Sequence, residues 1–201
     1  MTRVISGRFR GQVLVTPAGD QTRPTSDRVR ESFFSSLGSW LGTADQPAAQ
    51  ALAGVGFLDL YAGSGACGIE AASRGARQVH LVEQNPRVMA VARQNATRLG
   101  LRLKLTRGAV AAVLARPAPE PYDVVWLDPP YRLADSELAG VLQRVVHNGW
   151  LARAGLLVVE RSSRSPDPQP PPGLTEQWSR RYGETTIHYA TRAPSQEDSE
   201  S

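Results

Sequence analysis

The sequence predicts an α/β fold built on a mostly parallel sheet. From residue 55 onward, short apolar runs that are typical of buried strands alternate with segments that are typical of helices. Glycines follow the first of these runs, and two consecutive prolines stop the fourth. Strands that alternate with helices form a mostly parallel sheet covered on both faces, and ligands of such sheets bind beyond the carboxyl ends of the strands.

The first part of the chain is expected to form a hairpin and a helix. Residues 3–6 and 12–15 predict two short strands around a turn over residues 7–11. Thr25 or Ser26 can cap the helix that follows. The apolar residues of this helix recur at helical spacing, at Val29, Phe33, Phe34 and Leu37.

The main sheet is expected to contain five strands before a final hairpin. These strands are residues 55–61, 78–83, 101–105, 122–127 and 155–160. The helices between them are residues 65–74, 86–99, 109–115 and 135–146. Pro86 suits the first turn of its helix because that position needs no backbone N–H. Residues 174–181 and 185–191 predict an antiparallel hairpin, which brings the sheet to seven strands.

The chain is expected to divide into three parts that differ in charge. Residues 1–46 form a basic extension, residues 47–193 the main domain, and residues 194–201 an acidic tail that we expect to be disordered. Residues 1–30 hold six arginines against two aspartates, which equals the net charge of +4 of the whole chain. Such an arm can bind phosphate groups, although a solvated arginine-rich hairpin is the alternative.

Composition excludes several classes of protein. The 201 residues suit one domain with an appendage, and 41% hydrophobic residues are too many for global disorder. No apolar stretch approaches the roughly 18 residues that a membrane helix needs, and the N-terminus lacks the apolar core of a signal peptide. Cys67 is the only cysteine, so we expect no disulfide and a cytoplasmic location. No histidine pairs with an acid or a cysteine at ligand spacing, so no metal site is expected.

A glycine-rich turn follows the first expected strand of the sheet. Residues 63–68, Gly-Ser-Gly-Ala-Cys-Gly, match G-x-G-x-x-G, and Glu83 stands twenty residues after Gly63. This spacing suits a dinucleotide or S-adenosylmethionine, because both carry an adenosine whose ribose needs a carboxylate acceptor. Asp59 favours S-adenosylmethionine, since a carboxylate there suits a cationic methionine end and would repel a pyrophosphate. Asp59 as a brace of the turn, and Glu83 as a solvated strand-end charge, are the alternatives.

Residues 128–131, Asp-Pro-Pro-Tyr, end the fourth strand and are the most informative tetrapeptide in the chain. The two prolines hold a rigid turn. In it, the Asp128 carboxylate and the Pro129 carbonyl can both accept hydrogen bonds from an exocyclic amino group, which frees the nitrogen lone pair to attack a sulfonium methyl group. Tyr131 offers a flat face on which a base can stack once it has left its helix.

Several segments together carry a resemblance to a known family. They are residues 59–65 (Asp-Leu-Tyr-Ala-Gly-Ser-Gly), 128–131, 3–11 (Arg-Val-Ile-Ser-Gly-Arg-Phe-Arg-Gly), 23–31 (Arg-Pro-Thr-Ser-Asp-Arg-Val-Arg-Glu), 68–71 with 73–76, 82–85 and 182–185. The chain resembles the 16S rRNA (guanine(966)-N(2))-methyltransferase family over residues 3 to about 190. The resemblance implies a Rossmann-like class I S-adenosylmethionine-dependent methyltransferase fold that carries an N-terminal β-hairpin.

The resemblance also implies a set of site residues. The expected cofactor residues are Asp59, Ala62, Gly63, Ser64, Gly65, Glu83, Gln84, Gly108 and Ala109. The expected catalytic residues are Asp128, Pro129, Pro130 and Tyr131. The residues expected to face RNA are Arg3, Arg8, Arg10, Arg23, Thr25, Arg28 and Arg30. At the end of the third strand the chain has Arg107-Gly108-Ala109 where many relatives carry an acid or an amide, so adenine recognition there would rest on backbone amides or another side chain.

The expected substrate is 16S rRNA, in a 30S subunit or an assembly intermediate, and the expected state is a monomer. Three alternatives stay open at this point. A methyltransferase acting on adenine N6 or cytosine N4 of DNA or another RNA would use the same tetrapeptide. A non-catalytic RNA-binding assembly factor and a nicotinamide oxidoreductase are the others.

Overall fold

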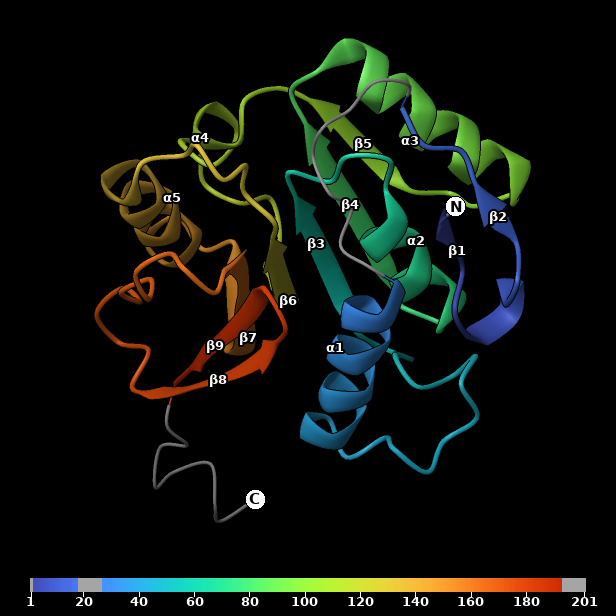
Figure 1. The fold of residues 1–201 in the computed structure, drawn as a ribbon, viewed down its shortest axis with the longest axis horizontal. Helices are drawn as coiled ribbons and strands as arrows, with labels where there is room; N and C mark the ends of the chain where they lie inside the picture. Colours follow the sequence, from blue (N-terminus) through green and yellow to red (C-terminus); the bar gives the residue numbers. More distant parts are fainter. Residues whose placement is uncertain (1, 18–26, 193–201) are drawn as a thin grey trace.

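The computed structural model describes residues 2–17 and 27–192, and its main feature is one seven-stranded sheet (Figure 1). Its strands are β3 (Gly56–Leu60), β4 (Gln78–Glu83), β5 (Lys104–Arg107), β6 (Tyr122–Leu127), β7 (Leu151–Ser162), β8 (Glu176–Tyr182) and β9 (Thr185–Thr191). They lie in the order β5-β4-β3-β6-β7-β9-β8. The pairs from β5 to β7 are parallel, and β9 pairs antiparallel with both β7 and β8. The predicted α/β class and its final antiparallel hairpin are confirmed.

Helices cover both faces of the sheet. They are α1 (Asp27–Trp40), α2 (Ala66–Ser73), α3 (Pro86–Arg98), α4 (Val110–Val113) and α5 (Asp135–His147). Side chains of α1, α2 and α3 share one apolar core with Phe57 and Val124, whereas those of α4 and α5 share a second core with Leu58 and Val125. Neighbouring residues of one strand therefore enter opposite cores, as the alternation of a pleated strand requires. No helix in the described part of the chain is long and apolar enough to span a membrane.

The N-terminal hairpin packs beside α2 and α3, at the far side of the molecule from β8 (Figure 1). Its strands are β1 (Thr2–Arg3) and β2 (Val13–Leu14), with the short 3-10 helix η1 (Gly7–Phe9) in the connection. A side chain on Gly7 is excluded, because a Cβ there would lie 2.1 Å from the Ser73 carbonyl oxygen, and its φ of +81° favours glycine. The expected hairpin is confirmed, although its paired segments are shorter than predicted.

Strands β5 and β7 differ most from their predicted bounds, whereas β3 and β8 differ by one or two residues at their ends. The alternation of residues 101–105 predicted a strand there, but β5 pairs with β4 from Lys104 to Arg107. Leu101 and Leu103 instead pack, half-buried, at the margin of the cores. Strand β7 is twice as long as the predicted residues 155–160, and a shift in its register with β6 separates its first part from the rest. The expected acidic tail and the Thr25 or Ser26 cap lie outside the described residues, and the three-part division of the chain stays a prediction.

Candidate active site

A cavity of about 340 Å³ lies beyond the carboxyl ends of β3, β4 and β6. Its walls come from the turn after β3, the ends of β4 and β6, the first turn of α1 and the segment that follows β2. The residues that line it are Thr16, Pro17, Arg30, Asp59, Tyr61, Ala62, Gly63, Ser64, Ala66, Cys67, Glu83, Gln84, Asn85, Val88, Trp126, Asp128, Pro129, Pro130, Tyr131 and Arg132. Because these three parallel strands are neighbours, their ends bring together residues that are far apart in the chain.

The glycine-rich turn forms the floor between β3 and α2. The backbone turns back at once, with the Gly65 N–H donating to the Ala62 carbonyl at 2.8 Å. Gly65 has a φ of +82°, which an ordinary side chain rarely tolerates. Gly68 lets α2 lie close to the sheet, since a Cβ on it would approach the Leu81 side chain to 2.2 Å. The glycines therefore serve the tight turn and the close packing that their spacing predicts.

Tyr61 holds a strained backbone at the cavity wall. Its φ is +62°, and it is the only non-glycine residue with a positive φ in the described part of the chain. A residue other than glycine pays about 1–3 kcal/mol in this region, and such strain clusters at functional sites. The half-buried Tyr61 side chain packs against the core formed with α4 and α5. The strained residue therefore joins this core to the wall of the cavity.

Asp59 is a buried carboxylate in the cavity wall. It is 1% exposed, and its Oδ2 accepts a hydrogen bond from the Gly68 N–H at 2.8 Å. Burial, followed by the negative charges of Asp128 and Glu83, raises its pKa to about 8. The bracing contact considered for Asp59 is therefore present, and Asp59 also lines the cavity. A cation in the cavity would stabilise its charged form.

Glu83 ends β4 on the opposite side of the turn. Its Oε2 accepts from the Gly63 N–H at 3.2 Å, and its Oε1 accepts from the Asn85 N–H at 2.7 Å. The Asn85 side chain in turn caps α3 by accepting from the Arg87 N–H at 2.9 Å. These two hydrogen bonds hold the Glu83 carboxylate at the cavity. There it can also accept hydrogen bonds from hydroxyl groups of a ligand.

The turn after β6 places its carboxylate on the same cavity. The Asp128 N–H donates to the Leu60 carbonyl at 3.4 Å, which ties the end of β6 to the end of β3. The Leu133 N–H then closes the turn on the Pro130 carbonyl at 2.8 Å. Tyr131, the last residue of the tetrapeptide, is 58% exposed at the mouth of the cavity. Trp126, near the end of β6, is buried and packs on Phe33 of α1 with ring centroids 4.4 Å apart.

Most of the expected site residues meet at this cavity, but not all of them. All four of the tetrapeptide line it, together with Asp59, Ala62, Gly63, Ser64, Glu83 and Gln84. Gly65 is buried beneath the turn, and neither Gly108 nor Ala109 lines the cavity. The Gly108 N–H donates instead to the Glu83 carbonyl at 3.1 Å, so the end of β5 supports the wall from behind.

The residues expected to face RNA do not share one environment. Arg3, Arg8, Arg10 and Arg28 are exposed, whereas Arg23 and Thr25 lie outside the described residues. Arg30 corrects the expectation of a surface contact, because its side chain is fully buried and lines the cavity. Its place on α1, three residues before the buried Phe33, puts it on the helix face that packs inward. Helical spacing was thus the signal that could have found it.

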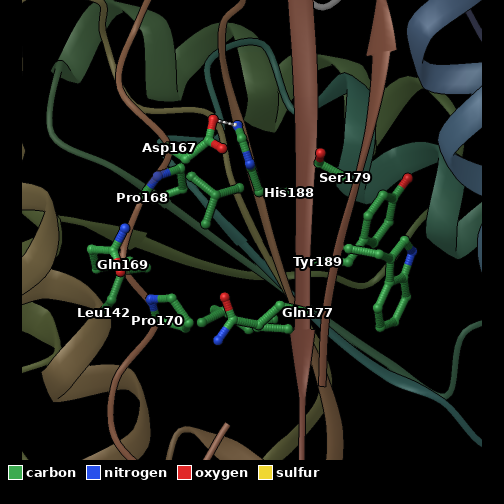
Figure 2. Close-up of a pocket in the computed structure, with 13 residues that line it drawn as sticks. Leu142, Asp167, Pro168, Gln169, Pro170, Gln177, Ser179, His188 and Tyr189 are labelled. Carbon is green, nitrogen blue, oxygen red and sulfur yellow. Dashed lines mark ion pairs between the residues drawn. The ribbon is translucent and has the colours of Figure 1, made fainter. Parts of the chain in front are cut away.

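A second cavity, of about 240 Å³, lies between the proline-rich loop that precedes β8 and the strands β7, β8 and β9 (Figure 2). Pro168, Gln169 and Pro170 face β8 and β9 across it, as Figure 2 shows. Asp167 and His188 point toward each other, with 3.9 Å between Oδ1 and Nε2. Burial lowers the pKa of His188, which weakens this pair. Of the predicted site residues that the structure describes, none lines this cavity.

Comparison with known proteins shows which family model and which solved structures this chain is similar to. A family model described as Conserved hypothetical protein 95 matches residues 2–191. Ribosomal RNA small subunit methyltransferase D of Escherichia coli is 34% identical over 163 residues, 79% of this chain and 73% of that protein. A solved E. coli structure described as a candidate methyltransferase, yhhF, is 30% identical with a TM-score of 0.78, covering 96% and 98% of the two chains.

The class of the fold is visible in a more distant structure. Magnesium protoporphyrin IX methyltransferase from Synechocystis PCC 6803, solved with bound S-adenosylmethionine, has a TM-score of 0.59 to this chain. Its 17% identity, over 87% of each chain, shows a likeness of fold alone. The fold is that of the class I methyltransferases, as expected.

Proposed function

This chain belongs to the family described as Conserved hypothetical protein 95, and we propose that it methylates the N2 amino group of one guanine in 16S rRNA. At the coarser level it is a methyltransferase of ribosomal RNA that uses S-adenosylmethionine. The observation that carries the proposal is a single cavity shared by Asp128, Asp59 and the glycine-rich turn. The groups that would hold a methyl donor and those that would hold an amine thus face the same space.

The residues on the cofactor side suit the charges of S-adenosylmethionine. The buried Asp59 is positioned for a cationic methionine end, because a nearby cation would restore its charged form. Glu83 offers oxygens to ribose hydroxyls at the end of β4, and the turn at Gly63 leaves room beside it. When bound, S-adenosylmethionine supplies a sulfonium methyl group to the lone pair of the target amine.

The tetrapeptide after β6 supplies the groups that would orient that amine. The Asp128 carboxylate and the Pro129 carbonyl each accept one hydrogen of an exocyclic NH₂ group. Accepting both hydrogens draws the nitrogen out of conjugation with its ring and fixes the direction of its lone pair. An aromatic amine is a very weak acid, so positioning and electrostatics contribute most of the activation. Asp128 then takes the proton that the nitrogen releases.

The mouth of the cavity suits a base that has left its helix. The exposed Tyr131 ring offers a stacking surface there, and base–aromatic stacking contributes about 1–3 kcal/mol per base. Exposed arginines on the hairpin and α1, including Arg8, Arg10 and Arg28, would contact the phosphates of the surrounding RNA. The substrate would be a small subunit or an assembly intermediate, and the enzyme a cytoplasmic monomer that leaves this face open.

The proposal is tested by methyl transfer from labelled S-adenosylmethionine. The acceptors are small subunits and naked 16S rRNA from cells that lack this protein, followed by nuclease digestion and mass analysis of the nucleosides. Small subunits from cells that contain the protein are the matched control, because their target is already methylated. We expect N2-methylguanosine from the first acceptors and no further transfer to the control.

Other outcomes would overturn defined parts of the proposal. Methylated adenosine or cytidine would contradict guanine N2 as the target while leaving the amine-binding turn in place. Label of equal amount in the control would contradict a single rRNA target. A failure to transfer to either acceptor, by a protein that still binds S-adenosylmethionine, would contradict the rRNA substrate.

A further inference from the structure

Arg30 is a buried cation whose hydrogen-bonding groups are only partly used. Its side chain is 0% exposed, and its Nη2 donates to the Arg3 carbonyl and, at 3.1 Å, to Asp27 Oδ1. Nε and Nη1 are buried without a hydrogen-bond partner among the described residues. A guanidinium carries five N–H groups, so three of those on Arg30 lack an acceptor among the residues that the structure describes. Buried donors without an acceptor are costly, which indicates that a ligand completes the set.

The position of Arg30 favours a ligand that carries both a negative group and a positive group. Arg30 lines the same cavity as Asp59, and it lies near enough that its positive charge lowers the pKa of that carboxyl. The two side chains are 0% and 1% exposed, so they present a buried cation and a buried anion to one space. The α-amino and carboxylate groups of an amino acid need this pair of opposite charges.

We propose that Arg30 binds the carboxylate of the methionine part of S-adenosylmethionine, while Asp59 faces its ammonium and sulfonium charges. This assignment rests on the proposed function, because it names a subsite of the same methyl donor. The N–H groups on Nε and Nη1 supply the donors that a carboxylate accepts. The Arg3 carbonyl and Asp27 hold the other end of the guanidinium, so its position is fixed before the ligand arrives.

A carboxylate suits this site better than an RNA phosphate does. Arg30 is completely buried on the wall that carries Asp59, whereas the exposed Tyr131 and Arg132 stand at the cavity mouth. A phosphate of the RNA backbone would have to enter the cavity past these residues with its neighbouring nucleotides attached. The carboxylate of a small ligand reaches the wall without that obstacle.

The experiment compares two ligands that differ in the carboxylate. Isothermal titration calorimetry measures the dissociation constants of S-adenosylmethionine and of decarboxylated S-adenosylmethionine for the unaltered protein. Because a hydrogen bond to a charged group contributes about 1.5–3 kcal/mol, we expect the intact ligand to bind about 10–100-fold more tightly. This ratio needs no substitution, so it is independent of any effect of a variant on folding.

Substitutions of Arg30 then test whether this residue causes the preference for S-adenosylmethionine over its decarboxylated form. In Arg30→Met, the ratio of the two dissociation constants should fall to about threefold or less, and Arg30→Lys should retain part of it. Arg161→Met is the matched control, because Arg161 is 5% exposed and does not line this cavity. Its Nε and Nη1, like those of Arg30, have no hydrogen-bond partner within residues 2–17 and 27–192. Its Nη2 pairs with Asp135 Oδ1 at 2.9 Å, so its loss removes a comparable ion pair. The control should keep the ratio of the unaltered protein.

Three results would overturn the inference, and they are distinguishable. Equal affinity of the unaltered protein for the two ligands would remove the carboxylate subsite while leaving the methyl donor in place. An unchanged ratio in Arg30→Met, together with weaker RNA binding of reduced salt dependence, would assign Arg30 to an RNA phosphate instead. No binding of S-adenosylmethionine at all would contradict the proposed function itself.

Discussion

Two buried carboxylates, in two regions of the molecule, have opposite surroundings. Glu70 on α2 is 0% exposed and accepts from the Ile5 N–H at 2.7 Å, the Ser6 N–H at 3.0 Å and Arg74 Nε at 2.8 Å. Asp59 on β3 is as deeply buried, but it accepts the Gly68 N–H, and its pKa is raised to about 8. The Glu70 carboxylate finds its hydrogen-bond partners within the fold, whereas a cation in the cavity would be needed to stabilise the charged form of Asp59.

The charge of Glu70 stabilises a junction of the fold, whereas Asp59 is one of several energetically costly features around the cavity. The junction around Glu70 joins the N-terminal hairpin to α2, and Ser73 adds to it by donating to the Ser6 carbonyl at 2.6 Å. The cavity, in contrast, is lined by the strained Tyr61, by Asp59 with its raised pKa, and by Arg30, whose Nε and Nη1 have no hydrogen-bond partner in the described part of the chain. Each of these features lowers stability, and a ligand can offset the contributions of Asp59 and Arg30. Unsatisfied groups that converge on one cavity therefore mark the site.

The largest effect on stability is expected from Glu70→Ala. The substitution leaves the Ile5 and Ser6 N–H groups and the Arg74 guanidinium without their acceptor, so we expect a loss of about 3–5 kcal/mol in the free energy of unfolding. Denaturant titration measures it. Glu70→Gln, which keeps one acceptor oxygen, should lose less. A loss below about 1 kcal/mol for Glu70→Ala would mean that the junction is not the structural anchor described here.

Asp59→Asn is expected to raise the free energy of unfolding, by an amount that depends on pH. Because the pKa of Asp59 is raised from 3.8 to about 8 in the folded protein, the folded state holds this proton more tightly than the unfolded state. The stability that Asp59 contributes is therefore greatest below about pH 4 and falls as the pH rises to about 8. Asparagine stays neutral, so the variant should gain roughly 2–4 kcal/mol on the unaltered protein between about pH 5 and pH 9.

The pH dependence of Asp59→Asn is measured on the ligand-free protein by thermal or denaturant unfolding across this range. The Glu70→Gln variant serves as the comparison, since its loss of stability has a different origin. A stability difference between Asp59→Asn and the unaltered protein that does not change with pH would show that Asp59 is not the strained charge of the cavity.

The smallest effect is expected at the surface, away from both carboxylates. Replacing the exposed Arg8 and Arg10 by alanine should leave stability nearly unchanged and weaken RNA binding. The slope of log affinity against log salt should flatten by about one unit for each lost phosphate contact. Arg116→Ala, an exposed arginine on another part of the surface, is the control. An unchanged slope for Arg8 and Arg10 would mean that the hairpin is solvated and does not contact RNA.

Much of the fold could be predicted from the sequence because its strands are short and apolar and its turns are marked by glycine and proline. Residues 78–83 and 122–127 were predicted to the residue, since each is a buried run with a clear end. Residues 101–105 were misplaced because alternation gives a periodicity but does not say which residues pair with β4. Pairing is a tertiary property, and it places the start of β5 three residues later and its end two residues later than predicted.

The candidate site was predictable where its residues end strands. Asp59, Glu83 and Asp128 follow from the rule that ligands bind at the carboxyl ends of parallel strands. Arg30 was expected on the surface because charged side chains usually stay in water, although its helical spacing from Phe33 places it on the inward face of α1. The positive φ of Tyr61 could not be predicted, because nothing in its residue type requires that conformation.

One variant, Asp128→Ala, separates the part of the cavity assigned to the amine from the part assigned to the methyl donor. Methyl transfer to RNA and the dissociation constant of S-adenosylmethionine are measured on the same preparation. Because Asp128 is assigned to the amine and not to the methyl donor, we predict a loss of transfer of about 100-fold or more with cofactor affinity changed by no more than about threefold. Normal turnover by Asp128→Ala would contradict the proposed mechanism.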